Sequence, residues 1–172
     1  MPARPAATRP APRLRRAYFE CRWGQLHVHN AIPAGGGFDE ATPLLCLHDA
    51  GATGRAFAAL LPVLGLDRSV YAPDLPGHGE SDAPATAPAA VDAAAAAVLD
   101  FLDGMRLRQL DLFAAGARGA AVAALLARDR PRALRRIVLL GDPAWPAGLP
   151  VAARLDGGLG AEASAGLLRL LG

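Results

Sequence analysis

The sequence contains no lysine, so all 18 of its basic residues are arginines. Neither a G-x-x-x-x-G-K-[ST] run nor a G-x-G-x-x-G run is present, which argues against the common nucleotide-binding motifs. The two cysteines, Cys21 and Cys46, have no C-x-x-C spacing. We therefore expect no zinc site at the thiols, no cofactor, and buried free thiols in a cytoplasmic protein. The apolar runs are short, and acidic residues interrupt the alanine-rich segment after Pro88, so we expect no membrane span.

What the chain does contain is enough apolar material for a core. At 172 residues it is expected to form one domain, and 52% of its residues are hydrophobic. The first sixteen residues carry five arginines and no acidic residue, so without them the formal net charge of +2 becomes 2 − 5 = −3. Such an arm could contact a nucleic acid or a membrane, or resemble an organelle transit peptide. We favour a disordered, solvated arm and expect neither nucleic-acid nor membrane partners.

Apolar segments of strand and helix periodicity alternate along the chain. This alternation predicts an α/β protein with a mostly parallel, doubly wound sheet and helices on both faces. A hairpin is expected to precede it, with strands at 17–20 and 26–29. The other expected strands are 44–47, one from residue 70, 110–114 and 137–140, and the expected helices are 55–64, 91–105, 118–127 and a short one at 161–171.

Two histidines of the predicted hairpin, His27 and His29, share one face of a strand because strand side chains repeat every two residues. Such a pair can bind a metal, but the sequence shows no third ligand beside it. We therefore interpret this face as solvated and predict no metal site.

Two glycine-rich turns follow predicted strands. The first is PLLCLHDAGATG at 43–54, and the second is VYAPDLPGHGESD at 70–82. In this order and spacing the two stretches resemble the α/β-hydrolase superfamily. The resemblance implies that a backbone N–H of the first turn forms half of an oxyanion hole, and Ala50, between Asp49 and Gly51, matches that donor. Asp49 replaces the usual glycine, and its negative charge argues against acyl transfer at this place.

In that family the nucleophile stands in the middle of G-x-S-x-G, at a sharp strand-to-helix turn. Residues 115–119 (AGARG) match these five positions and place Ala117 where the reacting hydroxyl belongs. An alanine can neither attack a carbonyl nor give up a proton. Shifting the register by one residue puts Gly116 there, which supplies no nucleophile either.

The other members of a catalytic triad are equally hard to assign. Asp142 matches an acid position known in some members of the superfamily, but an aspartate before proline is also typical of a turn. No histidine follows His78, and the resemblance gives His48 and His78 scaffold roles in the two glycine turns. Arg118 either binds a carboxylate or phosphate near the helix N-terminus, or points to solvent or to Asp142. The sequence leaves these two interpretations open.

The resemblance divides the chain into an arm at 1–16, a hydrolase-like core at 17–145 and a short tail at 146–172, where a cap would begin. It implies hydrolysis of a small ester or related substrate, although the missing hydroxyl and late histidine indicate impaired catalysis. The alternatives are a non-catalytic module that binds a small-molecule ligand or another protein, and a truncated piece of a longer hydrolase. The strand at 137–140 is expected to be an exposed edge that pairs with a second copy or a sheet-completing partner.

Overall fold

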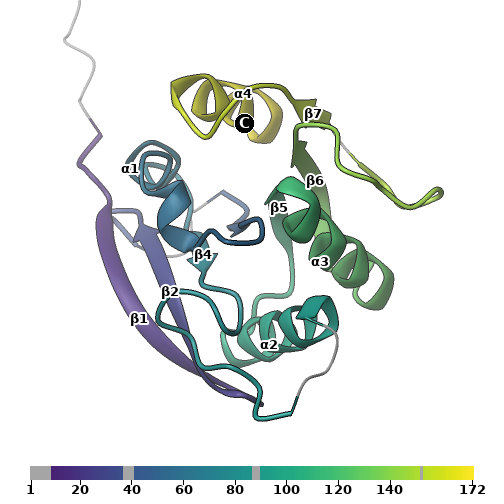
Figure 1. Cartoon of the computed structure of the whole chain (residues 1–172). Helices are drawn as coiled ribbons and strands as arrows, with labels where there is room; N and C mark the ends of the chain where they lie inside the picture. Colours follow the sequence, from purple (N-terminus) through teal and green to yellow (C-terminus); the bar gives the residue numbers. More distant parts are fainter. Residues whose placement is uncertain (1–8, 37–40, 87–89, 152) are drawn as a thin grey trace, which may run out of the picture.

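The computed structural model describes residues 9–36, 41–86, 90–151 and 153–172 and shows one twisted sheet between two helical layers (Figure 1). The seven strands have the order β1-β2-β4-β3-β5-β6-β7. β2 pairs antiparallel with both β1 and β4. The other neighbouring pairs, which are β4–β3, β3–β5, β5–β6 and β6–β7, are parallel. The strand bounds are β1 Arg13–Cys21, β2 Gly24–Ile32, β3 Leu44–Leu47, β4 Val70–Pro73, β5 Leu110–Ala115, β6 Leu134–Leu140 and β7 Ala153–Leu155.

The central strands β3, β4 and β5 are buried along their whole length because helices cover both faces of the sheet. On one face, helices α2 (Ala90–Gly104) and α3 (Gly116–Asp129) pack on a core that includes Leu112 and Leu126. On the other face, a 3₁₀ turn η1 (Gly54–Phe57), helix α1 (Leu61–Leu64) and helix α4 (Ala161–Leu171) pack on a second core around Phe57 and Phe113. The predicted mostly parallel, doubly wound sheet is thus confirmed.

Two predicted segments differ from the structure. The hairpin is present but longer than expected, and its first strand includes Arg13 to Arg16, which the prediction placed in the arm. Residues 1–8 of that arm lie outside the described residues. The predicted helix at 55–64 is two short pieces, η1 and α1. Pro62 sits in the first turn of α1, where its missing N–H costs no helical hydrogen bond, so it begins a helix there instead of continuing one.

The strand β6 is not the free edge that the sequence predicted. β7 pairs in parallel with its residues Val138–Leu140, and α4 then packs back on the sheet with Leu167 and Leu171 buried. Buried Arg68 fixes the end of this helix, because its Nη1 donates a hydrogen bond to the Leu171 carbonyl at 3.2 Å. The expected tail therefore extends the core.

The described ranges hold no helix that is both long and apolar enough to cross a membrane.

Candidate active site

Three turns meet at the carboxyl ends of the central strands, where open α/β sheets bind their ligands. They follow β3, β4 and β5. The turn after β5 is called the elbow here and comprises residues 115–119. β5 ends at Ala115, α3 begins at Gly116, and Gly116 has a φ of +67°. Because side chains avoid this left-handed conformation, glycine suits the position.

The structure thus places the apex of the elbow at Gly116 and not at Ala117. Ala117 lies exposed in the first turn of α3. The alignment that puts Ala117 at the nucleophile position is therefore one residue too far along the chain. The sequence does not separate the two registers, because small residues stand on both sides of the apex. Neither register brings a hydroxyl to the turn.

Asp49, from the turn after β3, covers the apex. Its Oδ1 accepts a hydrogen bond from the backbone N–H of Arg118 at 2.9 Å. A Cβ atom added to Gly116 would overlap the Asp49 carboxylate. The Asp49 side chain therefore fills the space into which a nucleophile at Gly116 would project. Its carboxylate also occupies one backbone N–H donor of the elbow, that of Arg118. Ala50 and Gly51, the other matched positions of this turn, lie exposed beside Asp49.

The two histidines of the glycine turns bind loop backbone. His48 is buried, with its Nδ1 2.8 Å from the carbonyl oxygen of Asp49, and its Nε2 accepts a hydrogen bond from the Leu75 N–H at 2.9 Å. Burial lowers the pKa of His48, and the charge of Arg118 contributes in the same direction. A neutral ring with its proton on Nδ1 satisfies both contacts and leaves no nitrogen for a substrate. The Nδ1 of His78 lies 3.2 Å from the Pro76 carbonyl oxygen.

Asp142 follows β6, but its side chain is 90% exposed and pairs with Arg154 at 2.8 Å. In the described part of the chain, none of the hydrogen bonds or ion pairs of a histidine involves Asp142. Arg118 forms no ion pair there either, so the expected alternative contact between Arg118 and Asp142 is not observed. Within the described ranges, no pair of a carboxylate and a histidine thus forms beside the elbow through Asp142.

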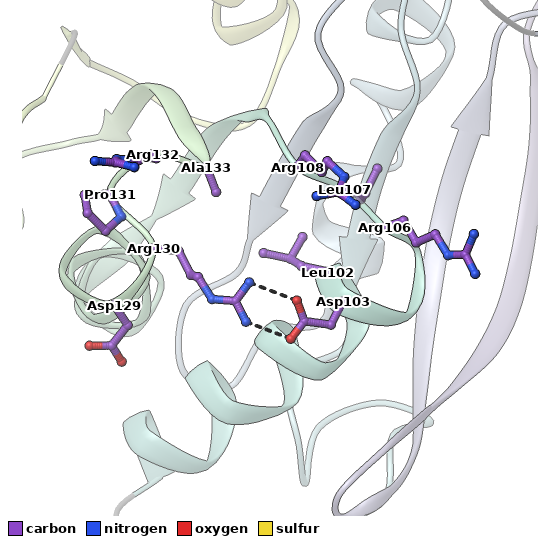
Figure 2. A pocket seen from close by; sticks show the side chains of 10 residues that line it. All are labelled: Leu102, Asp103, Arg106, Leu107, Arg108, Asp129, Arg130, Pro131, Arg132 and Ala133. Carbon is purple, nitrogen blue, oxygen red and sulfur yellow. Dashed lines mark hydrogen bonds and ion pairs between the residues drawn. The ribbon is translucent and has the colours of Figure 1, made fainter.

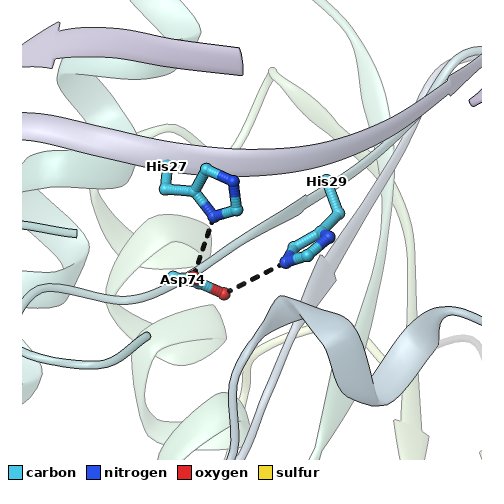
Figure 3. A group of neighbouring side chains, drawn as sticks. All are labelled: His27, His29 and Asp74. Carbon is cyan, nitrogen blue, oxygen red and sulfur yellow. Dashed lines mark hydrogen bonds and ion pairs between the residues drawn. The ribbon is translucent and has the colours of Figure 1, made fainter. Parts of the chain in front are cut away.

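Sequence reasoning missed a polar cluster at the end of β4. Buried Asp74 accepts hydrogen bonds from His27 Nδ1 at 2.9 Å, Gly54 N–H at 2.7 Å and Glu80 N–H at 3.0 Å, and His29 Nε2 lies 3.7 Å from its Oδ1 (Figure 3). The predicted solvated face is wrong, since the side chains of His27 and His29 are only 2% and 16% exposed. The third group that the sequence did not reveal is Asp74, brought there by antiparallel pairing of β2 with β4.

Asp74 gives a pH-dependent prediction. Burial alone would raise its pKa, but the hydrogen bonds from Glu80, His27 and Gly54 outweigh burial and lower it. A lowered carboxyl pKa stabilises the fold above the unfolded value of about 3.9, and the contribution is lost as the pH falls through the folded pKa. We expect Asp74→Asn to lower the free energy of unfolding by about 2–3 kcal/mol at pH 7 and by less near pH 3. Urea unfolding at both pH values tests this, and an equal loss at both would contradict it.

A cavity of about 480 Å³ lies away from these turns, between the end of α2, the end of α3 and the segments that enter β5 and β6 (Figure 2). Its lining includes three arginines, Arg106, Arg108 and Arg132. It also includes the ion pair between Arg130 and Asp103, whose two N–O contacts measure 2.9 and 2.7 Å. It is at the amino ends of β5 and β6, opposite the elbow, so it takes no part in the candidate active site.

Comparison of this chain with known proteins supports the fold and the arrangement of turns described above. The chain is 34% identical over 116 residues to a 2-hydroxymuconate semialdehyde hydrolase of Pseudomonas sp. (strain CF600), a match that covers 66% of this chain and 39% of that protein. Among solved structures, epoxide hydrolase CorEH is 20% identical with a TM-score of 0.65, covering 80% of this chain and 48% of its own. Haloalkane dehalogenase DbeA from Bradyrhizobium elkani USDA94 is 19% identical with a TM-score of 0.64, covering 74% and 42%. This chain therefore spans less than half the length of each of these proteins. The family model for the alpha/beta hydrolase fold matches residues 42–158, and the chain belongs to that family.

Proposed function

We propose that this chain does not hydrolyse substrates through its elbow, although it has the fold of a hydrolase. The observation that carries the proposal is the position of Asp49, whose carboxylate accepts the Arg118 N–H and fills the side-chain space of Gly116. Acyl transfer needs a nucleophile and free N–H donors at the developing oxyanion, and a fixed carboxylate at the same place repels that charge. The family-type reaction, hydrolysis of a small ester or related substrate, is therefore impaired at this site.

The second candidate function is non-catalytic binding of a small apolar molecule. A groove of about 530 Å³ runs between α2, α3 and the segment after β6, and is lined mainly by apolar side chains, including Val91, Leu125 and Trp145. A concave apolar surface with few polar groups is the usual form of a small-molecule site.

Both described cysteines are free thiols, which supports the cytoplasm as the proposed location.

One set of assays tests both parts. We expect no turnover of p-nitrophenyl acetate or butyrate above a protein-free blank, either by the unmodified chain or by Ala117→Ser. Turnover that scales with protein concentration and disappears in Asp49→Asn would overturn the proposal and assign the reaction to that carboxylate.

Binding to the groove is measured with the apolar dye 1-anilinonaphthalene-8-sulfonate. Saturable dye fluorescence that Leu125→Asp abolishes supports the groove, and unchanged binding in that variant contradicts it.

A further inference from the structure

We propose that His27, His29 and Asp74 form a Zn²⁺ site with one coordination position open to solvent. The inference does not depend on the proposed function, because none of the three residues belongs to the elbow or contacts Asp49 through a hydrogen bond or ion pair described above. Two imidazoles and one carboxylate are a ligand set that first-row transition metals prefer, and Zn²⁺ commonly binds through three such ligands when a fourth position stays open.

The geometry already brings the ligand atoms together. His27 and His29 project from one face of β2, and Figure 3 shows both rings turned toward Asp74. One ligand atom from each of the three residues lies within 4.8 Å of the others, with separations of 2.9 Å and 3.7 Å from the histidines to the carboxylate oxygens. Zinc bonds of about 2.0–2.1 Å in a tetrahedron place ligand atoms about 3.3 Å apart. Small side-chain shifts therefore suffice to bind the ion.

The backbone around the site orients the carboxylate independently of the histidines. The N–H groups of Gly54 and Glu80 each hold one oxygen of Asp74. Gly79 makes the second contact feasible, because its φ is +54° and a Cβ atom there would overlap the Asp74 carboxylate. Such outer hydrogen bonds fix the ligands of metal sites before the ion arrives.

The open position faces a cavity of about 520 Å³. His29 and Asp74 form part of its wall, and Arg16, Thr53, Arg55 and Glu80 complete most of the lining. Three protein ligands beside an accessible cavity are the arrangement of zinc sites that exchange a water or a ligand. The two arginines favour an anion, such as a carboxylate, as the exchangeable ligand.

The test uses the full chain without a histidine tag, freed of metal with a chelator. Titration calorimetry with ZnCl₂ is expected to show one ion per chain with a Kd in the micromolar range or below, and Co²⁺ to give the visible absorption bands of a tetrahedral site. His29→Gln is expected to weaken Zn²⁺ binding at least tenfold while the circular dichroism spectrum stays unchanged. His29 is partly exposed, its polar contact with Asp74 is a long one of 3.7 Å, and its ring packs edge-on against the His27 ring at 4.7 Å, a contact that the similarly sized Gln side chain can largely replace, so this variant should fold.

Two matched controls decide the assignment. His78→Gln removes a histidine outside the cluster and Cys21→Ser removes the more accessible thiol, so both are expected to bind Zn²⁺ as the unmodified chain does. Absence of binding, binding unchanged in His29→Gln, or binding lost in either control would overturn the proposal. Binding of Mg²⁺ as tightly as Zn²⁺ would also overturn it, because a site with two imidazoles does not suit Mg²⁺.

Discussion

Asp111→Ala is expected to lower the free energy of unfolding by about 3–5 kcal/mol. Asp111 is fully buried at the start of β5. Its oxygens accept hydrogen bonds from Arg135 Nε at 3.0 Å and Nη2 at 2.6 Å, and Arg68 Nη1 lies 3.7 Å away. Arg68 is only 1% exposed, so removing Asp111 leaves a buried guanidinium. Among the described residues, its remaining ion-pair partner is then the neighbouring Asp67.

The loss should also reach the C-terminal helix. Arg68 holds the Leu171 carbonyl at the end of α4, so an Arg68 that moves toward solvent releases this contact. We expect amide hydrogen exchange in α4 to accelerate more than in α2, which packs on the other face of the sheet. Uniform acceleration throughout the chain would contradict this coupling.

Urea unfolding followed by circular dichroism measures the effect, and Asp129→Ala is the matched control. Asp129 pairs with Arg128 at 2.8 Å, but both side chains are at least 40% exposed. Exposed pairs contribute little, so the control should unfold at the same urea concentration as the unmodified chain. A similar midpoint for Asp111→Ala would show that the buried cluster does not stabilise the fold.

The strands that sequence alone located are those with strong local signals. The apolar runs at β3, β5 and β6 predict buried strands, and the turn between β1 and β2 consists of Arg22 and Trp23, directly before Gly24. By contrast, β7 is three residues long and only partly buried, so it gives no periodic signal. Because β7 pairs with β6, the edge that the sequence predicted to be free is a paired strand.

The candidate site was predictable only where it is local in sequence. The two glycine turns and the lack of a hydroxyl at the elbow follow from residues within single motifs. The position of the apex depends on one backbone angle at Gly116, and the contact of Asp49 with Arg118 joins segments that are far apart in the chain. His27 and Asp74 likewise meet through the pairing of β2 with β4, which no short pattern specifies. Long-range geometry therefore decided the chemistry of both places.

The second large effect is expected for Gly116→Ser, which should lower the free energy of unfolding by about 2–5 kcal/mol. About 1–2 kcal/mol comes from placing a side chain in a left-handed conformation, and about 1–3 kcal/mol from overlap with the Asp49 carboxylate. Asp49→Gly alone should cost only about 1 kcal/mol, because it loses the hydrogen bond to the Arg118 N–H.

The double variant separates these causes. If Asp49 fills the nucleophile space, removing its side chain relieves the overlap, and Asp49→Gly with Gly116→Ser should be more stable than the sum of the single effects by at least about 1 kcal/mol. Ala117→Ser is the control, because residue 117 is exposed and should show no such coupling to Asp49. Urea unfolding of all six proteins completes two cycles. Coupling at residue 117 in place of residue 116 would move the apex back to Ala117, while coupling at neither would mean that Asp49 does not block the elbow.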